Sequence, residues 1–200
     1  MNLDSGRRRS PLRTQLRETV RSAILDAAEE LIAARGLHGA ALAQIARKAG
    51  VAVGSLYNYF TDREALVKAL FESRRATLRP MLAAAAAAGR DLAFEPRLRR
   101  FLHETLVAYE SHRRFLKVAI ETEHVKMAPS TTAQDLQRVL VEIVAAGVAE
   151  RVVAPAHADL LPLLVAGAIR SVVLRRTADG EPFVADADAV VSILLDGARR

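Results

Sequence analysis

The sequence predicts an all-α protein, in which an N-terminal helix-turn-helix unit precedes a larger helical domain. Apolar residues recur three and four positions apart along most of the 200 residues, which is the period of a helix with one inward face. No stretch alternates apolar and polar residues with a period of two, so we expect no sheet. The segment 42–60 also has the pattern of two short helices joined by a glycine turn.

The chain begins with a basic tail, residues 1–10, which we expect to be disordered, and it lacks the apolar run of a signal peptide. Ser10 and Pro11 suit the cap and first turn of a helix, whose apolar stripe runs to Gly36. Five arginines near this start either contact DNA phosphates or the minor groove, or form a solvated surface: Arg7, Arg8, Arg9, Arg13 and Arg17.

Residues 42–60 carry the motif. A first helix over 42–49 has an inward face, and Gly50 follows where a left-handed backbone is needed. A second helix begins near Val53 and directs Leu56 and Phe60 to the core. Neither helix has a side-chain cap, because Ala41 and Ala52 occupy the capping positions.

The outward side of the second helix has side chains that suit nucleic acid. Ser55, Asn58 and Tyr59 are expected to point outward, with Tyr57 at the edge. Hydroxyl and amide groups, without a carboxylate, match the hydrogen-bonding groups of bases and phosphates. Double-stranded DNA is therefore the predicted partner.

A further helix is expected after the motif. Thr61 and Glu64 have the spacing of a capping box, and Pro80 should kink or end the helix. The segment 89–95 is then the best boundary between a DNA-binding domain over 11–80 and a second domain over 90–200. The predicted helices of the second domain are 95–111, 112–121, 132–152, 157–176 and 186–198.

The residues of the motif and its flanks resemble the N-terminal signature of the tetracycline-repressor (TetR) family. The resemblance covers roughly 20–66 and rests on IleLeuAspAlaAlaGluGluLeu (24–31), Gly36, IleAla (45–46), AlaGlyVal (49–51), Gly54, LeuTyrAsnTyrPhe (56–60) and Leu66. It implies an all-helical, dimeric transcription regulator, most often a repressor of a pseudo-palindromic operator, that a small molecule releases from DNA.

The DNA-binding residues are assigned on the same positions. Val53, Ser55 and Asn58 are expected to face bases, with Gly54 in the same helix. Tyr57, Tyr59 and Arg63 are expected to contact DNA phosphates. Arg63 stands at a position where the family usually has a phosphate-binding lysine. Contacts that the family makes from the first motif helix would fall on Leu42 and Ala43, which are unsuited to them, so Gln44 is expected to contact DNA instead.

The segment 160–174 is apolar on every side except at Arg170, and therefore has to be covered on every side. It is shorter than the roughly 20 residues that span a bilayer, so a membrane span is not predicted. With the helix before it, the segment resembles the dimer-forming bundle of the family; the alternative is an intrachain core helix. The predicted interface is Leu136, Leu140, Ile143, Gly147, Leu164, Gly167, Ala168 and Ser171.

An effector pocket is predicted between residues 95 and 145, because polar and aromatic residues follow helices there. Apolar walls with a few polar groups are typical of small-molecule sites, and favour a mainly hydrophobic effector. Alternatively, the phenylalanines belong to the core and the His and Glu residues are solvated. The candidate residues are Phe101, Thr105, Tyr109, His112, Phe115, Glu121 and His124.

Composition agrees with a cytoplasmic regulator that is nucleoid-associated when bound to its operator. The chain has no cysteine, so it has neither a disulfide nor a thiolate metal site. Residues 1–63 hold ten Lys/Arg against six Asp/Glu, a net charge of +4. Because this charge flanks the motif, nucleic acid fits better than a membrane as the partner.

Two other classes of protein fit the sequence less well. An enzyme is not expected: Glu121 and His124 could share a helical face, but no further metal ligands follow at a recognisable spacing, and no nucleophile elbow or phosphate loop is present. No cofactor or metal is predicted. A constitutive, nucleoid-type DNA-binding protein would share the motif, but would not need a second domain of this size.

Overall fold

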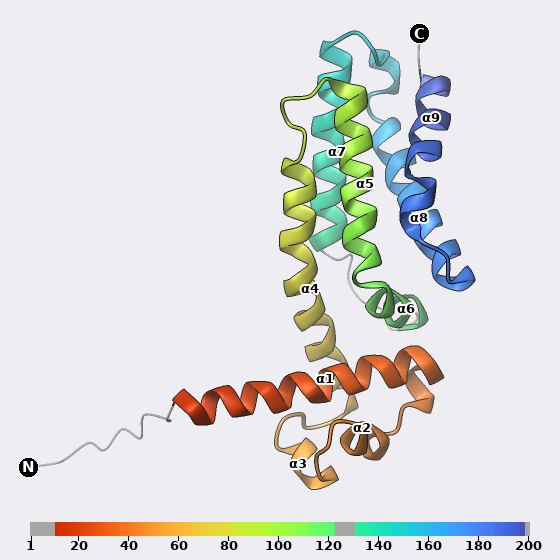
Figure 1. The fold of residues 1–200 in the computed structure, drawn as a ribbon. Helices are drawn as coiled ribbons and strands as arrows, with labels where there is room; N and C mark the ends of the chain where they lie inside the picture. The colour runs from red at the N-terminus through yellow and green to blue at the C-terminus, as the bar shows by residue number, and fades with distance from the viewer. Residues whose placement is uncertain (1–10, 123–130, 199–200) are drawn as a thin grey trace, which may run out of the picture. The chain divides into compact units, whose positions relative to one another are not determined.

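The computed structural model describes residues 11–122 and 131–198, and the regular structure of these ranges is helical, as predicted (Figure 1). The basic tail 1–10 and His124 lie outside the described residues. The α-helices are α1 (Pro11–Gly39), α2 (Leu42–Lys48), α3 (Val53–Tyr57), α4 (Arg63–Ala87), α5 (Phe94–Glu110), α6 (Arg113–Thr122), α7 (Thr131–Ala149), α8 (Leu161–Asp179) and α9 (Ala187–Ala198). Two short 3-10 helices are η1 (Pro155–His157) and η2 (Phe183–Asp186).

Internal contacts divide the chain into two compact units within α4, between Glu72 and Ser73. Pro80 was expected to kink or end this helix; it does not end it, because α4 continues through the proline to Ala87. Leu78 and Ala85, on either side of the proline, are both buried, and we attribute the continuity of the helix to their packing. The segment 89–95 is a turn within the second unit, where Gly89 has a φ of 73°.

The first unit is built around the face of α1 that contacts α2, and α2 in turn contacts α3. Ile24 and Ile32 of α1, Ile45 of α2 and Leu56 of α3 are at most 1% exposed. These positions confirm the predicted inward faces of the motif. Gly36 has a φ of 72° and interrupts α1 where the sequence predicted the helix to end.

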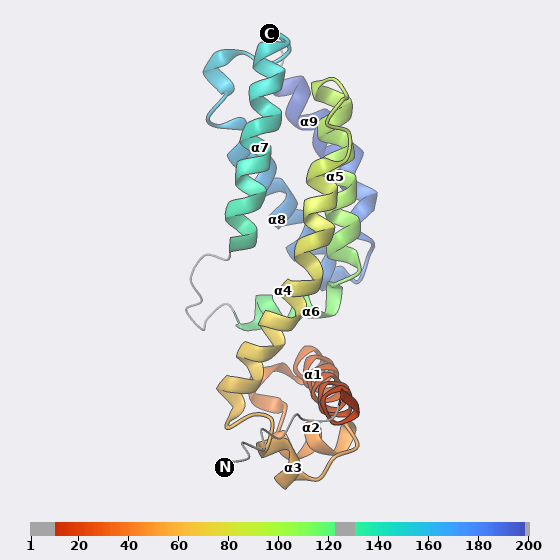
Figure 2. The same ribbon diagram turned by 90° about the vertical axis from the view of Figure 1, so that its left-hand side faces the viewer.

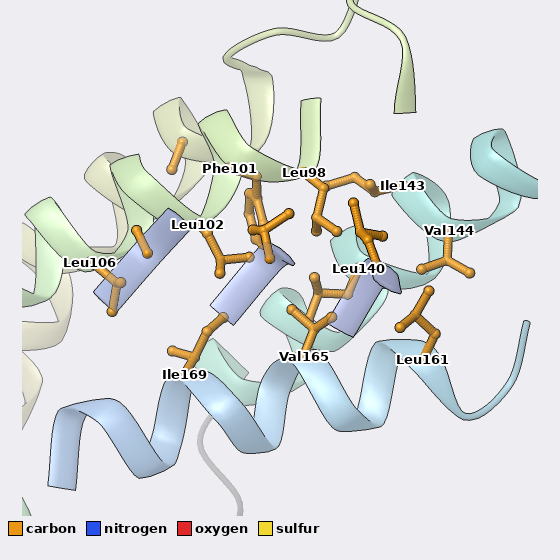
Figure 3. Close-up of a cluster of buried hydrophobic side chains, with 14 of the residues drawn as sticks. Leu98, Phe101, Leu102, Leu106, Leu140, Ile143, Val144, Leu161, Val165 and Ile169 are labelled. Carbon is orange, nitrogen blue, oxygen red and sulfur yellow. The ribbon is translucent and has the colours of Figure 1, made fainter. Parts of the chain in front are cut away.

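The second unit is a bundle in which α5, α7, α8 and α9 run alongside one another (Figures 1 and 2). Figure 3 shows side chains from three of these helices converging on one core. They are Leu98, Phe101, Leu102 and Leu106 of α5, Leu140, Ile143 and Val144 of α7, and Leu161, Val165 and Ile169 of α8.

Gly147 marks the close approach of α7 to the start of α5. A Cβ atom at this glycine would lie 2.6 Å from Cδ2 of Phe94. Close by in the sequence, the Glu150 carboxylate accepts a hydrogen bond from the Phe94 amide at 3.0 Å and so caps α5. Gly147, Leu140 and Ile143 therefore face the protomer's own core, which corrects their assignment to a dimer interface.

Charged groups join η2 to α5, α6 and α8. The Arg113 guanidinium lies 4.2 Å from the centre of the Phe183 ring and donates to Glu110 at 2.7 Å. Arg176 donates to both carboxylate oxygens of Asp186 at 2.7 Å. The hydrogen bonds from Arg113 and Arg176 lower the pKa of Glu110 and of Asp186 respectively.

Candidate functional site

The turn between α2 and α3 holds the two motif helices in a fixed arrangement. Gly50 adopts the predicted left-handed backbone, with a φ of 72°. Next to it, the Val51 amide donates to the Ala46 carbonyl at 3.0 Å. As expected, neither Ala41 nor Ala52 provides a side-chain cap, so backbone hydrogen bonds and the burial of Leu56 position α3.

Opposite Leu56, α3 and its C-cap present a small exposed surface. Val53 is 42% exposed and Tyr57 is 51% exposed, while Gly54 and Asn58 are also exposed. Ser55 and Tyr59 are less exposed than these residues and are half-buried. Tyr57 rather than Tyr59 is thus the more accessible tyrosine, the reverse of the sequence prediction; the Tyr59 ring lies beside Arg17 of α1.

Gln44 lies half-buried on α2, and its side-chain oxygen accepts a hydrogen bond from Arg35 at 3.0 Å. This bond uses one lone pair of the amide oxygen and leaves the NH₂ group of Gln44 available to donate. At the end of α2, Arg47 and Lys48 are both exposed, and Lys48 forms an ion pair of 2.6 Å with Glu30.

The start of α4 differs in detail from the prediction. Asp62, not Thr61, caps the helix, because its carboxylate accepts from the Ala65 amide at 2.7 Å. Arg63 is half-buried and donates to the carbonyl of Leu37. Arg63 thus holds the end of α1 against the start of α4, a structural role that the sequence assignment to phosphate did not include.

Two arginines of α1 lie beside the motif, and sequence reasoning missed one of them. Arg17 lies 5.7 Å from the centre of the Tyr59 ring, and Arg21 lies 5.5 Å from that of Phe60. The signal in the sequence was a spacing of four residues from Arg13 through Arg17 to Arg21. That spacing places all three arginines on one side of a helix.

The candidate pocket residues of the second unit are mostly buried. Phe101, Thr105 and Phe115 are at most 4% exposed, whereas Glu121 is exposed and so does not line an interior site. Burial raises the pKa of Tyr109 to about 12, so its hydroxyl is protonated at neutral pH.

Polar groups occur just after the C-terminal end of α5 and also within the helix. His112 has its Nε2 2.9 Å from the Thr77 hydroxyl of α4 and its Nδ1 2.9 Å from Ser111. Deeper in the unit, the hydroxyls of Thr105 on α5 and Thr177 on α8 are buried and have no hydrogen-bond partner among the described residues. A buried hydroxyl without a hydrogen bond destabilises the folded state, because it has lost its hydrogen bonds to water.

One side of α8 is apolar and exposed. Leu160, Leu163 and Leu164 are 57%, 56% and 48% exposed, and Gly167 and Ser171 continue the same side. Among the other predicted interface residues, Leu136 and Ala168 are half-buried. On the adjacent α9, Ile193 is 73% exposed. We call this surface of Leu160, Leu163, Leu164, Gly167, Ser171 and Ile193 the α8–α9 surface.

Along the described ranges, no helix combines the length and apolar character that crossing a membrane requires.

Residues 24–70 match the family model of the bacterial regulatory proteins, tetR family. The fatty acid metabolism regulator protein of Bacillus subtilis (strain 168) is 43% identical over 51 residues, which are 26% of this chain and 26% of that protein. The match thus spans about a quarter of the length of this curated relative.

Two solved structures resemble almost the whole chain. The ketosteroid transcriptional regulator KstR2 of Mycobacterium tuberculosis has a TM-score of 0.70 at 21% identity, over 90% of this chain and 95% of that one. FadR from Bacillus subtilis, solved in complex with stearoyl-CoA, has a TM-score of 0.64 at 21% identity, over 89% and 99%. Residues 24–70 therefore carry the N-terminal domain of the tetR family of bacterial regulatory proteins, and the chain as a whole has the all-helical fold of the transcriptional regulators that it resembles.

Proposed function

We propose that this chain is a dimeric repressor of transcription that binds a pseudo-palindromic operator and is released by a small, mainly hydrophobic effector. The observation that carries the proposal is α3, which buries Leu56 completely and exposes Val53, Tyr57 and Asn58 within a unit of the tetR family. Its place of action is the cytoplasm, at the nucleoid. Its ligand is DNA, and no catalytic step is part of the role.

Each exposed group of α3 suits a different part of the duplex. The Asn58 amide offers both a donor and an acceptor to a base edge, and Val53 offers a methyl group to a thymine. The Tyr57 hydroxyl suits a phosphate oxygen, which positions the helix without reading sequence. Because one such helix covers only a few base pairs, two copies related by two-fold symmetry are needed for a longer site.

Tyr57→Ala and Asn58→Ala should weaken DNA binding in different ways. The tyrosine variant should lose affinity for all sequences, roughly 10-fold or more for one hydrogen bond to a charged group. The asparagine variant should lose a similar factor on the preferred duplex and little on a duplex changed at one base pair. Fluorescence anisotropy on a duplex selected by the wild-type chain from a random library would measure both.

Ser22→Ala provides a matched control, because Ser22 is exposed on α1 of the same unit. Its affinity should equal that of the wild type. If the Tyr57→Ala/Asn58→Ala double variant also binds the selected duplex with wild-type affinity, α3 is not the recognition helix.

The proposed effector site lies along α5, around Thr105 and Tyr109. A buried threonine hydroxyl without a partner among the described residues is the kind of group that a ligand can satisfy. Apolar surroundings, with Phe101 and Phe115 buried nearby in the sequence, favour a hydrophobic ligand. Two regulators of similar fold also favour a hydrophobic ligand. One was solved in complex with stearoyl-CoA, and the other is a ketosteroid regulator.

Thr105→Val should separate stability from ligand binding. Removal of the unpaired hydroxyl should raise the unfolding free energy by about 1 kcal/mol. The same change should weaken an effector that bonds to the hydroxyl by roughly 2–13-fold, the worth of one neutral hydrogen bond. Thermal unfolding and calorimetry with stearoyl-CoA, stearic acid and a steroid ketone as probes would measure both effects, with the surface variant Thr19→Val as the control.

Release from DNA requires a coupling that works in both directions. A probe that weakens operator binding 5–150-fold must itself bind that much more weakly in the presence of the operator. Helix α4 is continuous between the two units and is the proposed route of this coupling. A probe that binds equally well with and without the selected duplex would favour the constitutive DNA-binding protein instead.

A further inference from the structure

The first turns of α1 extend beyond α2 and α3 (Figure 1). The N-terminal half of this helix carries a row of positively charged side chains. Arg13, Arg17 and Arg21 are spaced four residues apart, so each guanidinium follows the last by about 6 Å along one side of the helix. Arg13 and Arg17 are exposed, and Arg21 is half-buried. We refer to these three residues as the arginine row.

The row lies on the side of α1 that carries the helix-turn-helix. Arg17 is 5.7 Å from the centre of the Tyr59 ring and Arg21 is 5.5 Å from that of Phe60. Both rings belong to the segment that immediately follows α3. The arginines are therefore next to the surface formed by Tyr57 and Asn58, and Arg13 continues that line toward the start of α1.

Nothing in the described part of the chain neutralises this charge. None of the three guanidinium groups forms an ion pair with a described carboxylate, although Glu18 lies within the same turns of the helix. Like charges four residues apart on a helix repel each other, and an anion bound along the row would remove that repulsion. A guanidinium held near an aromatic ring by a cation–π contact still has N–H groups that can donate to phosphate oxygens.

We propose that the arginine row binds successive phosphates of the DNA backbone, so that each protomer contacts DNA along α1 as well as through α3. The inference rests on the proposed DNA-binding function and extends it by three residues outside the helix-turn-helix. Contacts to phosphates carry no sequence information, so the row contributes affinity and salt dependence but no base preference.

The test is the triple variant Arg13→Gln/Arg17→Gln/Arg21→Gln of the full chain, titrated with the duplex selected by the wild type at several salt concentrations. Each lost phosphate contact should reduce the slope of log affinity against log salt by about 0.9, or nearly 3 per protomer. Preference among duplexes changed at single base pairs should stay as in the wild type. The triple lysine variant should retain most of the slope, because lysine keeps the charge.

A second triple variant, Arg100→Gln/Arg138→Gln/Arg175→Gln, removes the same net charge from exposed positions of the second unit. Its salt slope should match that of the wild type, which separates local contact from overall charge. Ethylation interference should also show phosphates that matter for the wild type and not for the first triple variant. Arg13→Gln alone removes an exposed arginine that makes no ring contact with the described residues, and should reduce the slope by about 0.9 per protomer without affecting folding.

The possible outcomes separate the two proposals. If the wild type selects a duplex but the first triple variant has an unchanged salt slope and interference pattern, the arginine row does not bind DNA. If the row instead proves necessary for binding to phosphatidylserine vesicles and not to DNA, the assignment to nucleic acid is overturned. Failure of the wild type to select any duplex would reject the proposed function itself.

Discussion

Gly147→Ala should lower the unfolding free energy of this protein by about 3 kcal/mol, near the upper end of the usual cost of overpacking a core. The new Cβ would lie 2.6 and 2.7 Å from ring atoms of Phe94 and 2.9 Å from Cγ2 of Val153. The Phe94 side chain is 0% exposed and its amide donates to the Glu150 carboxylate, so neither the ring nor the backbone can easily move away. Urea denaturation followed by circular dichroism would measure the change.

Gly167→Ala is the matched control for this variant. It also lies within a helix of the second unit, but a Cβ there meets no atom within 4 Å. Alanine should therefore stabilise the protomer by up to about 1 kcal/mol through its higher helix propensity. A second check is Phe94→Leu, which should reduce the cost of Gly147→Ala when the two changes are combined. Equal unfolding free energies for both glycine variants would contradict the packing described at Gly147.

Leu164→Glu should convert the proposed dimer into a monomer. Leu164 is 48% exposed at the centre of the α8–α9 surface, so a protomer can carry the glutamate without harm to its fold. In a dimer that covers this surface, the carboxylate would be buried without a partner, at a cost of several kcal/mol. The dimer dissociation constant should rise at least about 100-fold, as sedimentation velocity over a dilution series would show.

Loss of the dimer should also remove high-affinity binding to the operator, because a single protomer reads only one half-site. Val107→Glu is the control, since Val107 is 38% exposed on α5, a helix that contributes no residue to the proposed surface. It should leave both dimer and operator affinity unchanged. Val141 is 50% exposed on α7. The variant Val141→Glu tests the predicted contribution of α7 to the dimer interface. Dissociation by Val141→Glu but not by Leu164→Glu would place the interface on α7.

The helix-turn-helix was predictable because its determinants are local. Gly50 takes the left-handed backbone that the pattern required, and Leu56 and Phe60 are 0% and 4% exposed as expected. These residues lie within one or two turns of each other, so backbone sterics and the helical period suffice to place them. The cap of α4 was less predictable, because Thr61 and Asp62 are both good caps and only the geometry of the turn selected Asp62.

The interface residues show where local pattern stops being informative. The sequence by itself determined that 160–174 is an apolar helix and that small residues occur in both α7 and α8. Only the tertiary structure decided that Gly147 accommodates the Phe94 ring inside the protomer, while Gly167 remains open. Periodicity reports which residues share a face of a helix, whereas the neighbour that covers that face comes from residues far away in the chain. For the same reason the arginines of α1 could be counted from the sequence, but their stacking beside Tyr59 and Phe60 required the fold.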